Sequence, residues 1–132
     1  MILSGSVLIR GAPAVVYRIT TVAGPGDSRG ESFGQEGFAL RVAVGDPPLA
    51  IDASGNLYLA GGDADLLNNF IMKMDHGMLS RFAGTGTSGF SGDGGPATKA
   101  QLRSPWDIVM DAMGNICFSD GDNWVIRKLE RQ

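Results

Sequence analysis

Several features that often reveal a protein's chemistry are scarce in this sequence. It contains one cysteine, Cys117, and one histidine, His76, so it predicts neither an internal disulfide nor a zinc site made of Cys and His ligands. Lys and Arg form no run and the formal net charge is −3, which argues against nucleic acid and anionic membranes as partners. No apolar stretch reaches the ~20 residues of a membrane span, and residues 1–20 lack the basic start and unbroken apolar core of a signal peptide. We therefore expect no signal peptide and no transmembrane segment, and the compartment stays undefined.

Glycine, by contrast, is abundant. The chain has 20 glycines in 132 residues, twice the usual share of about 7%, yet 43% of its residues are hydrophobic. A disordered chain would be poorer in apolar residues. Short apolar runs separated by frequent turn residues predict a single all-β domain.

The sequence also repeats itself. Asp52 aligns with Asp111, at a spacing of about 59 residues, within the matching segments AIDASGNLYLAGGD and VMDAMGNICFSDGD. Two further matches occur in the same order, 19–26 with 79–86 and 70–75 with 125–130. The smaller spacing of the last match places a short insertion in the first copy, between Gly62 and Asn69. Self-similarity at a fixed period of this length is typical of repeat proteins.

Each copy is expected to form antiparallel strands joined by tight turns. Short apolar runs end at Asp52 and Asp111, and each is followed by a Gly-Asn turn of the kind that joins neighbouring strands. The recurrence of the aspartate favours a role in ordering the turn over a catalytic role. For the complete copy we predict strands near residues 48–52, 56–60, 70–74 and 79–83. The chain then divides into residues 1–23 (strands 6–10 and 15–23 of a preceding unit), residues 24–83 (a connection and a complete unit) and residues 84–132 (a connection and three strands).

The glycine-rich stretch at residues 83–102 has three interpretations: a phosphate-binding loop, a flexible linker or a connection between repeats. Pro96 follows the glycines and no Lys-Ser/Thr pair opens a helix, which argues against a phosphate loop. A decayed counterpart at residues 33–39 occupies the same place in the first copy, which argues against a linker. We expect a structural connection with glycines at positive φ and one helical turn that begins at Pro96.

The second copy resembles the NHL repeat in its long bacterial form. The shared motifs are Ala-Gly-x-Gly at 83–86, Gly-Phe-x-Gly-Asp-Gly-Gly-Pro-Ala at 89–97, Asp-x-x-Gly-Asn at 111–115 and Ile-Arg-Lys at 126–128. The resemblance covers roughly residues 15 to 130, and the first copy departs from it by losing the Gly-Asp-Gly-Gly-Pro segment and enlarging the loop at 61–69. It implies an all-β partial β-propeller of about two four-stranded antiparallel blades, part of a six-bladed ring. Full-length members of the family are often secreted.

Two blades cannot close a ring, because closed propellers have about four to eight. Either the sequence is a piece of a larger propeller, or three copies complete the ring, with residues 15–23 of one chain supplying the missing outer strand of another. Duplication of strand 6–10 by 125–129 favours the first alternative. In either case the open blade edges predict self-association of the isolated chain.

Eight residues are candidates for contact with a protein or small-molecule ligand. Ligands of propellers commonly use the face that carries the loop between the second and third strands and the connection between blades, and aromatic and Arg residues on loops are typical contact anchors. The candidates are Asp63, Asp65, Asn69, Phe90, Arg103, Trp106, Asn123 and Trp124. For Phe90 and Trp106 the alternative is packing between blades.

No catalytic set or cofactor motif is recognisable in the sequence. Asp93, Asp120, Asp122 and Asn123 carry the oxygen ligands that calcium prefers, but they lie on different loops without the spacing of a calcium loop. We therefore expect a non-catalytic binding scaffold that needs no metal and no cofactor. The alternative is a fragment of a six-bladed propeller enzyme, similar to the gluconolactonase-like hydrolases or peptide-amidating lyases, which hold a metal over the central channel.

Overall fold

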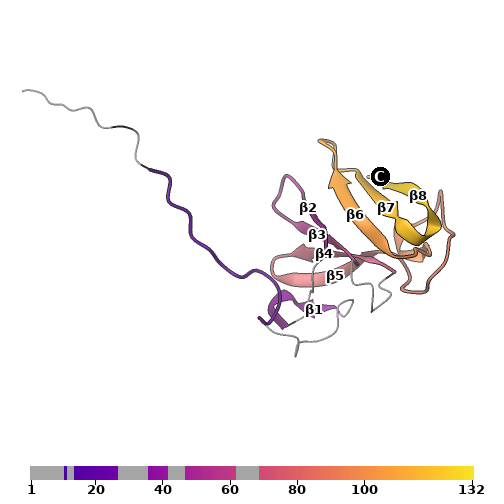
Figure 1. The fold of residues 1–132 in the computed structure, drawn as a ribbon, viewed down its shortest axis with the longest axis horizontal. Helices are drawn as coiled ribbons and strands as arrows, with labels where there is room; N and C mark the ends of the chain where they lie inside the picture. Colours follow the sequence, from indigo (N-terminus) through magenta and orange to yellow (C-terminus); the bar gives the residue numbers. More distant parts are fainter. Residues whose placement is uncertain (1–10, 12–13, 27–35, 42–46, 62–68) are drawn as a thin grey trace, which may run out of the picture.

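The structure, a computed structural model, describes residue 11 and residues 14–26, 36–41, 47–61 and 69–132. These residues form two antiparallel β-sheets and three short 3₁₀ turns, without an α-helix (Figure 1). The first sheet has the strand order β1-β5-β4-β3-β2 and the second has the order β6-β7-β8. No helix in this part of the chain is long and apolar enough to cross a membrane.

The strand bounds agree closely with the sequence prediction. The first sheet contains β1 (Gly37–Phe38), β2 (Leu49–Ile51), β3 (Leu57–Ala60), β4 (Ile71–Asp75) and β5 (Met78–Ala83), and the second contains β6 (Pro105–Met110), β7 (Ile116–Asp120) and β8 (Val125–Leu129). The 3₁₀ turns are η2 (Ala39–Arg41), η3 (Ala97–Lys99) and η4 (Gly121–Asn123). The four strands predicted for the complete copy are confirmed to within one residue at each end, and consecutive strands pair antiparallel.

The strand predicted at residues 15–23 is not formed in this structure. We expected a strand, but residues 14–26 contain none, and the segment runs away from the two sheets in Figure 1. Tyr17 is 88% exposed and Ile19 is 100% exposed. A strand forms only where a partner takes up its backbone N–H and C=O groups, and no strand among the described residues pairs with this segment. The other expected strand, 6–10, lies outside the described residues.

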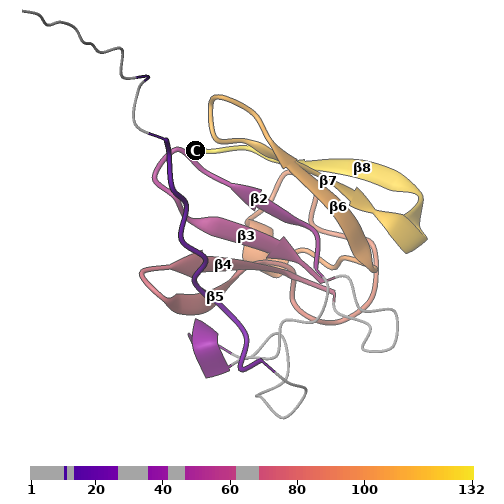
Figure 2. The ribbon, with the colours of Figure 1, turned by 60° about the vertical axis from the view of Figure 1, so that its left-hand side comes forward.

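The main core lies between the two sheets, which pack face to face with β2 next to β6 (Figure 2). Side chains alternate along each strand, so one face of the first sheet and one face of the second supply this core. Its buried members are Tyr58, Ala60, Ile71, Ala83, Ala100, Leu102, Ile108, Ile116 and Phe118. A second cluster covers the opposite face of the first sheet and comprises Ala39, Leu59, Phe70, Met72, Met74 and Leu79.

The two connections have the same local structure. The N–H of Gly24 donates to the carbonyl of Ala39 at 2.8 Å, and the N–H of Gly84 donates to the carbonyl of Ala97 at 2.9 Å. The two glycines have φ values of 87° and 91°, which favour glycine because they are strained for residues with a Cβ. A 3₁₀ turn begins at each of the two alanines, and η3 follows Pro96 as expected. The sequence counterparts Ala39 and Ala97 are therefore structurally equivalent as well.

The two aspartate turns are also equivalent. In both, one carboxylate oxygen accepts from the backbone N–H groups two and four residues later at 2.9 Å, and the other accepts from the asparagine side chain at 2.8 Å. The hydrogen bond from Asn56 is the main cause that lowers the pKa of Asp52 to about 2. The hydrogen bond from Asn115 likewise lowers the pKa of Asp111. The expected role of both aspartates in ordering the turn, and the expected positive φ of Gly114 (86°), are confirmed.

Candidate functional site

Six of the eight candidate residues are described. They lie at one end of the two sheets, five on loops or turns and Trp106 as the second residue of β6. Asp63 and Asp65 lie outside the described residues. Hydrogen bonds join the loop that precedes β4 to the connection between β5 and β6. The Oδ1 of Asn69 accepts from the N–H of Ser104 at 3.2 Å, and its Nδ2 donates to the carbonyl of Gly86 at 3.2 Å. The loops therefore share one end of the molecule, which we call the loop face.

Two of the candidates belong to the framework of the loop face. Asn69 is 3% exposed and its side-chain oxygen and nitrogen both take part in the hydrogen bonds just described. The Nδ2 of Asn123 donates to the carbonyl of Gly89 at 2.8 Å and to Asp120 at 2.9 Å. These internal hydrogen bonds fix the loops relative to one another.

The aromatic candidates are exposed. Phe90 is 56%, Trp106 62% and Trp124 92% exposed, so neither Phe90 nor Trp106 is buried between the two sheets of this structure. Trp124 also has a left-handed backbone, with φ of 58°, at the end of η4. A bulky residue in this conformation is unusual and strained, and such residues concentrate at functional sites.

A buried ion pair fixes the connection beneath these aromatic residues. Arg127 donates four hydrogen bonds: to the carbonyls of Gln101 (2.9 Å) and Ser91 (2.8 Å), and to the carboxylates of Asp120 (3.2 Å) and Asp93 (2.6 Å). Its guanidinium also lies 5.2 Å from the centre of the Phe90 ring. Asp120 is fully buried and accepts from the N–H of Arg103 at 2.6 Å as well. We call Arg127 and Asp120, with Asp93, the arginine network.

The acidic residues considered for calcium have other partners. Asp120 and Asp93 pair with Arg127, and Asp122 accepts from the hydroxyl of Ser104 at 2.9 Å. Across the described residues, no three His, Cys, Asp or Glu side chains are grouped so that they could hold a metal ion.

Sequence reasoning did not identify the arginine network, although a signal was present. The first copy has Gly61 where the second has Asp120, and Met72 where the second has Arg127. It has also lost the Gly-Asp-Gly-Gly-Pro segment that contains Asp93. The three parts of the network are thus all present in one copy and all absent from the other, as expected for side chains that act together.

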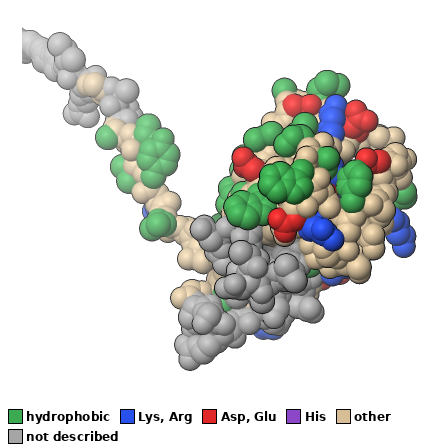
Figure 3. Space-filling model, turned by 45° about the vertical axis from the view of Figure 1, so that its right-hand side comes forward, with side chains coloured by type: hydrophobic (Ala, Val, Ile, Leu, Met, Phe, Trp, Pro, Cys, Tyr) green, Lys and Arg blue, Asp and Glu red, His purple; other side chains and the backbone are tan. Residues whose placement is uncertain are grey.

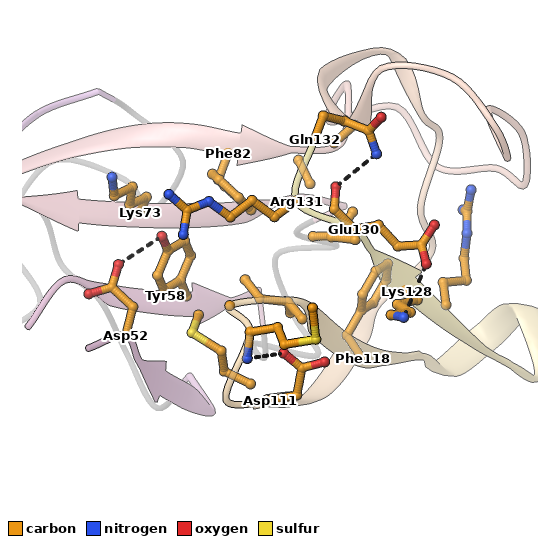
Figure 4. Close-up of a pocket in the computed structure, with 18 of the residues that line it drawn as sticks. Asp52, Tyr58, Lys73, Phe82, Asp111, Phe118, Lys128, Glu130, Arg131 and Gln132 are labelled. Carbon is orange, nitrogen blue, oxygen red and sulfur yellow. Dashed lines mark hydrogen bonds and ion pairs between the residues drawn. The ribbon is translucent and has the colours of Figure 1, made fainter. Parts of the chain in front are cut away.

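A groove of about 1170 Å³ lies between the sheets, toward the end that carries the two aspartate turns. Its lining includes both turns, residues 92–97 of the connection and residues 127–132. In Figure 4 the side chain of Arg131 points toward Tyr58, whose hydroxyl donates to Asp52 at 3.2 Å. Burial is the main cause that raises the pKa of Tyr58. Acidic and basic groups are mixed along the groove, so its chemistry does not select a ligand of one charge.

Comparison with known proteins shows similarity at the level of the fold. No protein-family model and no curated protein matches the chain. Among solved structures, the chain is similar to a structural genomics protein of unknown function from Bacteroides thetaiotaomicron, with a TM-score of 0.63 and 24% sequence identity. The match covers 71% of this chain and 23% of that chain. The chain therefore spans less than a quarter of that protein's length, and shares its fold over the matched part.

Proposed function

We propose that this chain forms adjacent blades of an NHL-like β-propeller and acts as a binding scaffold rather than as an enzyme. Three features support the proposal. The connection and the aspartate turn recur with the same hydrogen bonds in both copies. The sheets pack face to face, with β2 beside β6, as successive blades do. The NHL-like motifs of the second copy lie on the connection, on the aspartate turn and, for Ile-Arg-Lys, within β8.

The loop face is the proposed binding surface, and the observation that carries the proposal is the exposure of Trp124. A side chain of this size that is 92% exposed has much apolar area to remove from water when a partner binds. Trp106 and Arg103 lie on the same face, and residues of these types dominate binding energies at protein interfaces. Because small molecules are ordinarily enclosed by concave sites, aromatic side chains that project outward fit a protein or peptide partner.

The arginine network supports this role because it limits the motion of the loops. Preorganised loops lose less conformational entropy when a partner binds. The internal hydrogen bonds of Asn69 and Asn123 also limit the motion of the loops. The loop face therefore combines loops that are fixed by internal hydrogen bonds with exposed aromatic side chains that can contact a partner.

A selection from a peptide display library against the purified chain tests the proposal. Selected peptides are then measured against Trp124→Ala and Trp106→Ala. Met113→Ala is the matched control, because Met113 is 77% exposed but lies in the turn between β6 and β7, at the other end of the sheet. We expect at least one tryptophan variant to lose affinity by about tenfold or more, and the control to keep it. Selected peptides that bind both tryptophan variants as tightly as the parent would overturn the proposal.

A further inference from the structure

Equivalent residues of the two copies differ sharply in exposure. Ile71 on β4 is fully buried, whereas Ile126, at the equivalent place on β8, is 73% exposed. Conversely, Ile108 on β6 is 4% exposed and its equivalent on β2, Leu49, is 57% exposed. Ile71 and Ile108 are buried because the two sheets cover each other. Ile126 therefore marks an exposed outer face on the second sheet, and Leu49 marks one on the first sheet. In each case the equivalent face of the other copy is buried between the two sheets.

Among the described residues, the second sheet also lacks a counterpart of β5. In the first sheet β5 lies between β4 and β1. In the second sheet no described strand pairs with the outer side of β8, and Gly95-Pro96 is the sequence counterpart of β1. The groove between the sheets is lined by residues 92–97 and by residues 127–132. The part of the groove between these two segments lies where the first copy places β5.

Residues 15–23 have the sequence of such a strand. Their segment Ile-Thr-Thr-Val-Ala-Gly (19–24) matches Leu-Ser-Arg-Phe-Ala-Gly (79–84), which contains most of β5. Its apolar side chains are exposed and lie in a segment without strand pairing. The following residue, Gly24, makes the same backbone hydrogen bond as Gly84. Residues 15–23 thus precede the first connection in the same way as β5 precedes the second.

The segment cannot reach β8 of its own chain. Ala23 packs against the cluster on the face of the first sheet that points away from the second sheet. A strand continuing backward from Ala23 therefore belongs to a neighbour on that outer face.

We propose that residues 15–23 of one copy add as a fourth strand to β8 of a second copy. The outer face of the second copy's β6–β8 sheet, which exposes Ile126 and Val109, then packs on the outer face of the first copy's β2, which exposes Leu49 and Ile51. The contact between copies repeats the contact between the two sheets within one chain. Such a head-to-tail contact uses different surfaces on the two partners. It does not depend on the binding role of the loop face.

The pairing register of the first sheet predicts which residues meet. Met78 lies opposite Asp75, Leu79 opposite Met74, and Ser80 opposite Lys73. The equivalent pairs between copies are Arg18 with Glu130, Ile19 with Leu129, and Thr20 with Lys128. The first pair joins opposite charges across the strands, which is stabilising. In the second pair the isoleucine enters the groove beside the leucine.

Charge reversal is the first test. Size-exclusion chromatography with light scattering, at a series of protein concentrations, measures association of the parent, Arg18→Glu, Glu130→Arg and the double variant. We expect the parent to associate, each single variant to shift toward monomer, and the double variant to recover. Both residues are exposed, so the single variants should keep the circular dichroism spectrum of the parent. A parent that stays monomeric at every concentration, or association that the single variants leave unchanged, would overturn the proposal.

Disulfide trapping tests the register itself. Two differently tagged copies, both carrying Cys117→Ala, are mixed, one with Thr20→Cys and the other with Lys128→Cys. Residues directly opposite in antiparallel strands are close enough for a disulfide, so we expect the mixed dimer to form under mild oxidation. Thr20→Cys mixed with Ile126→Cys is the matched control, because that pair is out of register and should not cross-link. Equal cross-linking of both pairs, or none in either, would overturn the assigned register and with it the strand addition.

Discussion

Replacing Arg127 with methionine, the residue at the equivalent position 72, tests the structural role of the arginine network. The variant removes four hydrogen bonds and the contact with Phe90. The side chain is only 8% exposed, so water cannot readily replace these partners. Asp120 keeps its hydrogen bonds from Arg103 and Asn123 but loses its counter-charge.

The size of the effect follows from burial. Removing one partner of a buried ion pair costs about 3–5 kcal/mol, because the remaining charge is buried without compensation. Asp120 is fully buried, so Arg127→Met falls in this range. Asp93 is 71% exposed, and an exposed pair contributes about 0–1 kcal/mol. Asp93→Ala should therefore be nearly neutral.

Urea denaturation followed by far-UV circular dichroism, at one fixed protein concentration, measures these differences. The set is the parent, Arg127→Met, Asp120→Ala, Asp93→Ala and the double variant Arg127→Met/Asp120→Ala. We expect the double variant to lose less stability than the sum of its two single variants, by at least about 1 kcal/mol, because it buries no uncompensated charge. If Arg127→Met changes the free energy of unfolding by less than about 0.5 kcal/mol, or if the single effects add, the reasoning about the buried pair is refuted.

Two further predictions concern the turns. Gly114→Val should cost on the order of 1–3 kcal/mol through backbone strain at its positive φ, whereas Gly84→Ala should cost more, because a Cβ there would also lie 2.7 Å from the Cα of Phe70. Thermal melts of the two variants check this order, and a Gly84→Ala protein as stable as the parent would contradict it. The folded protein holds Asp52 with a pKa of about 2, below its ordinary 3.8, so this carboxylate stabilises the fold above about pH 4 and the contribution is lost as the pH falls toward 2. Asp52→Asn should accordingly flatten the fall in stability between these pH values in urea titrations, and an unchanged pH dependence would show that the turn does not favour the ionised form.

The parts of the fold that sequence reasoning predicted are those made by local contacts. Asp52 and Asp111 bond to groups within four residues, so the turn motif by itself specifies the interaction. Alternating apolar residues between such turns were enough to place four strands to within one residue. The shared loop face followed from the antiparallel order of those strands.

The arginine network and the state of residues 15–23 depend on groups far apart in the chain. Arg127 and Asp93 are separated by 34 residues, and only folding brings the connection onto β8. A strand at 15–23 has the right sequence but needs an edge to pair with. No described strand of its own chain pairs with it, because its end at Ala23 packs on the face of the first sheet that points away from the open edge at β8.

By itself, the sequence determined the repeat, the strands and the turns of this protein, because each arises from alternation and from hydrogen bonds between near neighbours. Only the tertiary structure decided which apolar faces are covered. Ile71 and Ile126 are the same residue type at the same place in the repeat, yet the first is fully buried and the second is 73% exposed. The difference comes entirely from the neighbouring sheet, since burial depends on what lies across the face and not on the strand that carries the residue.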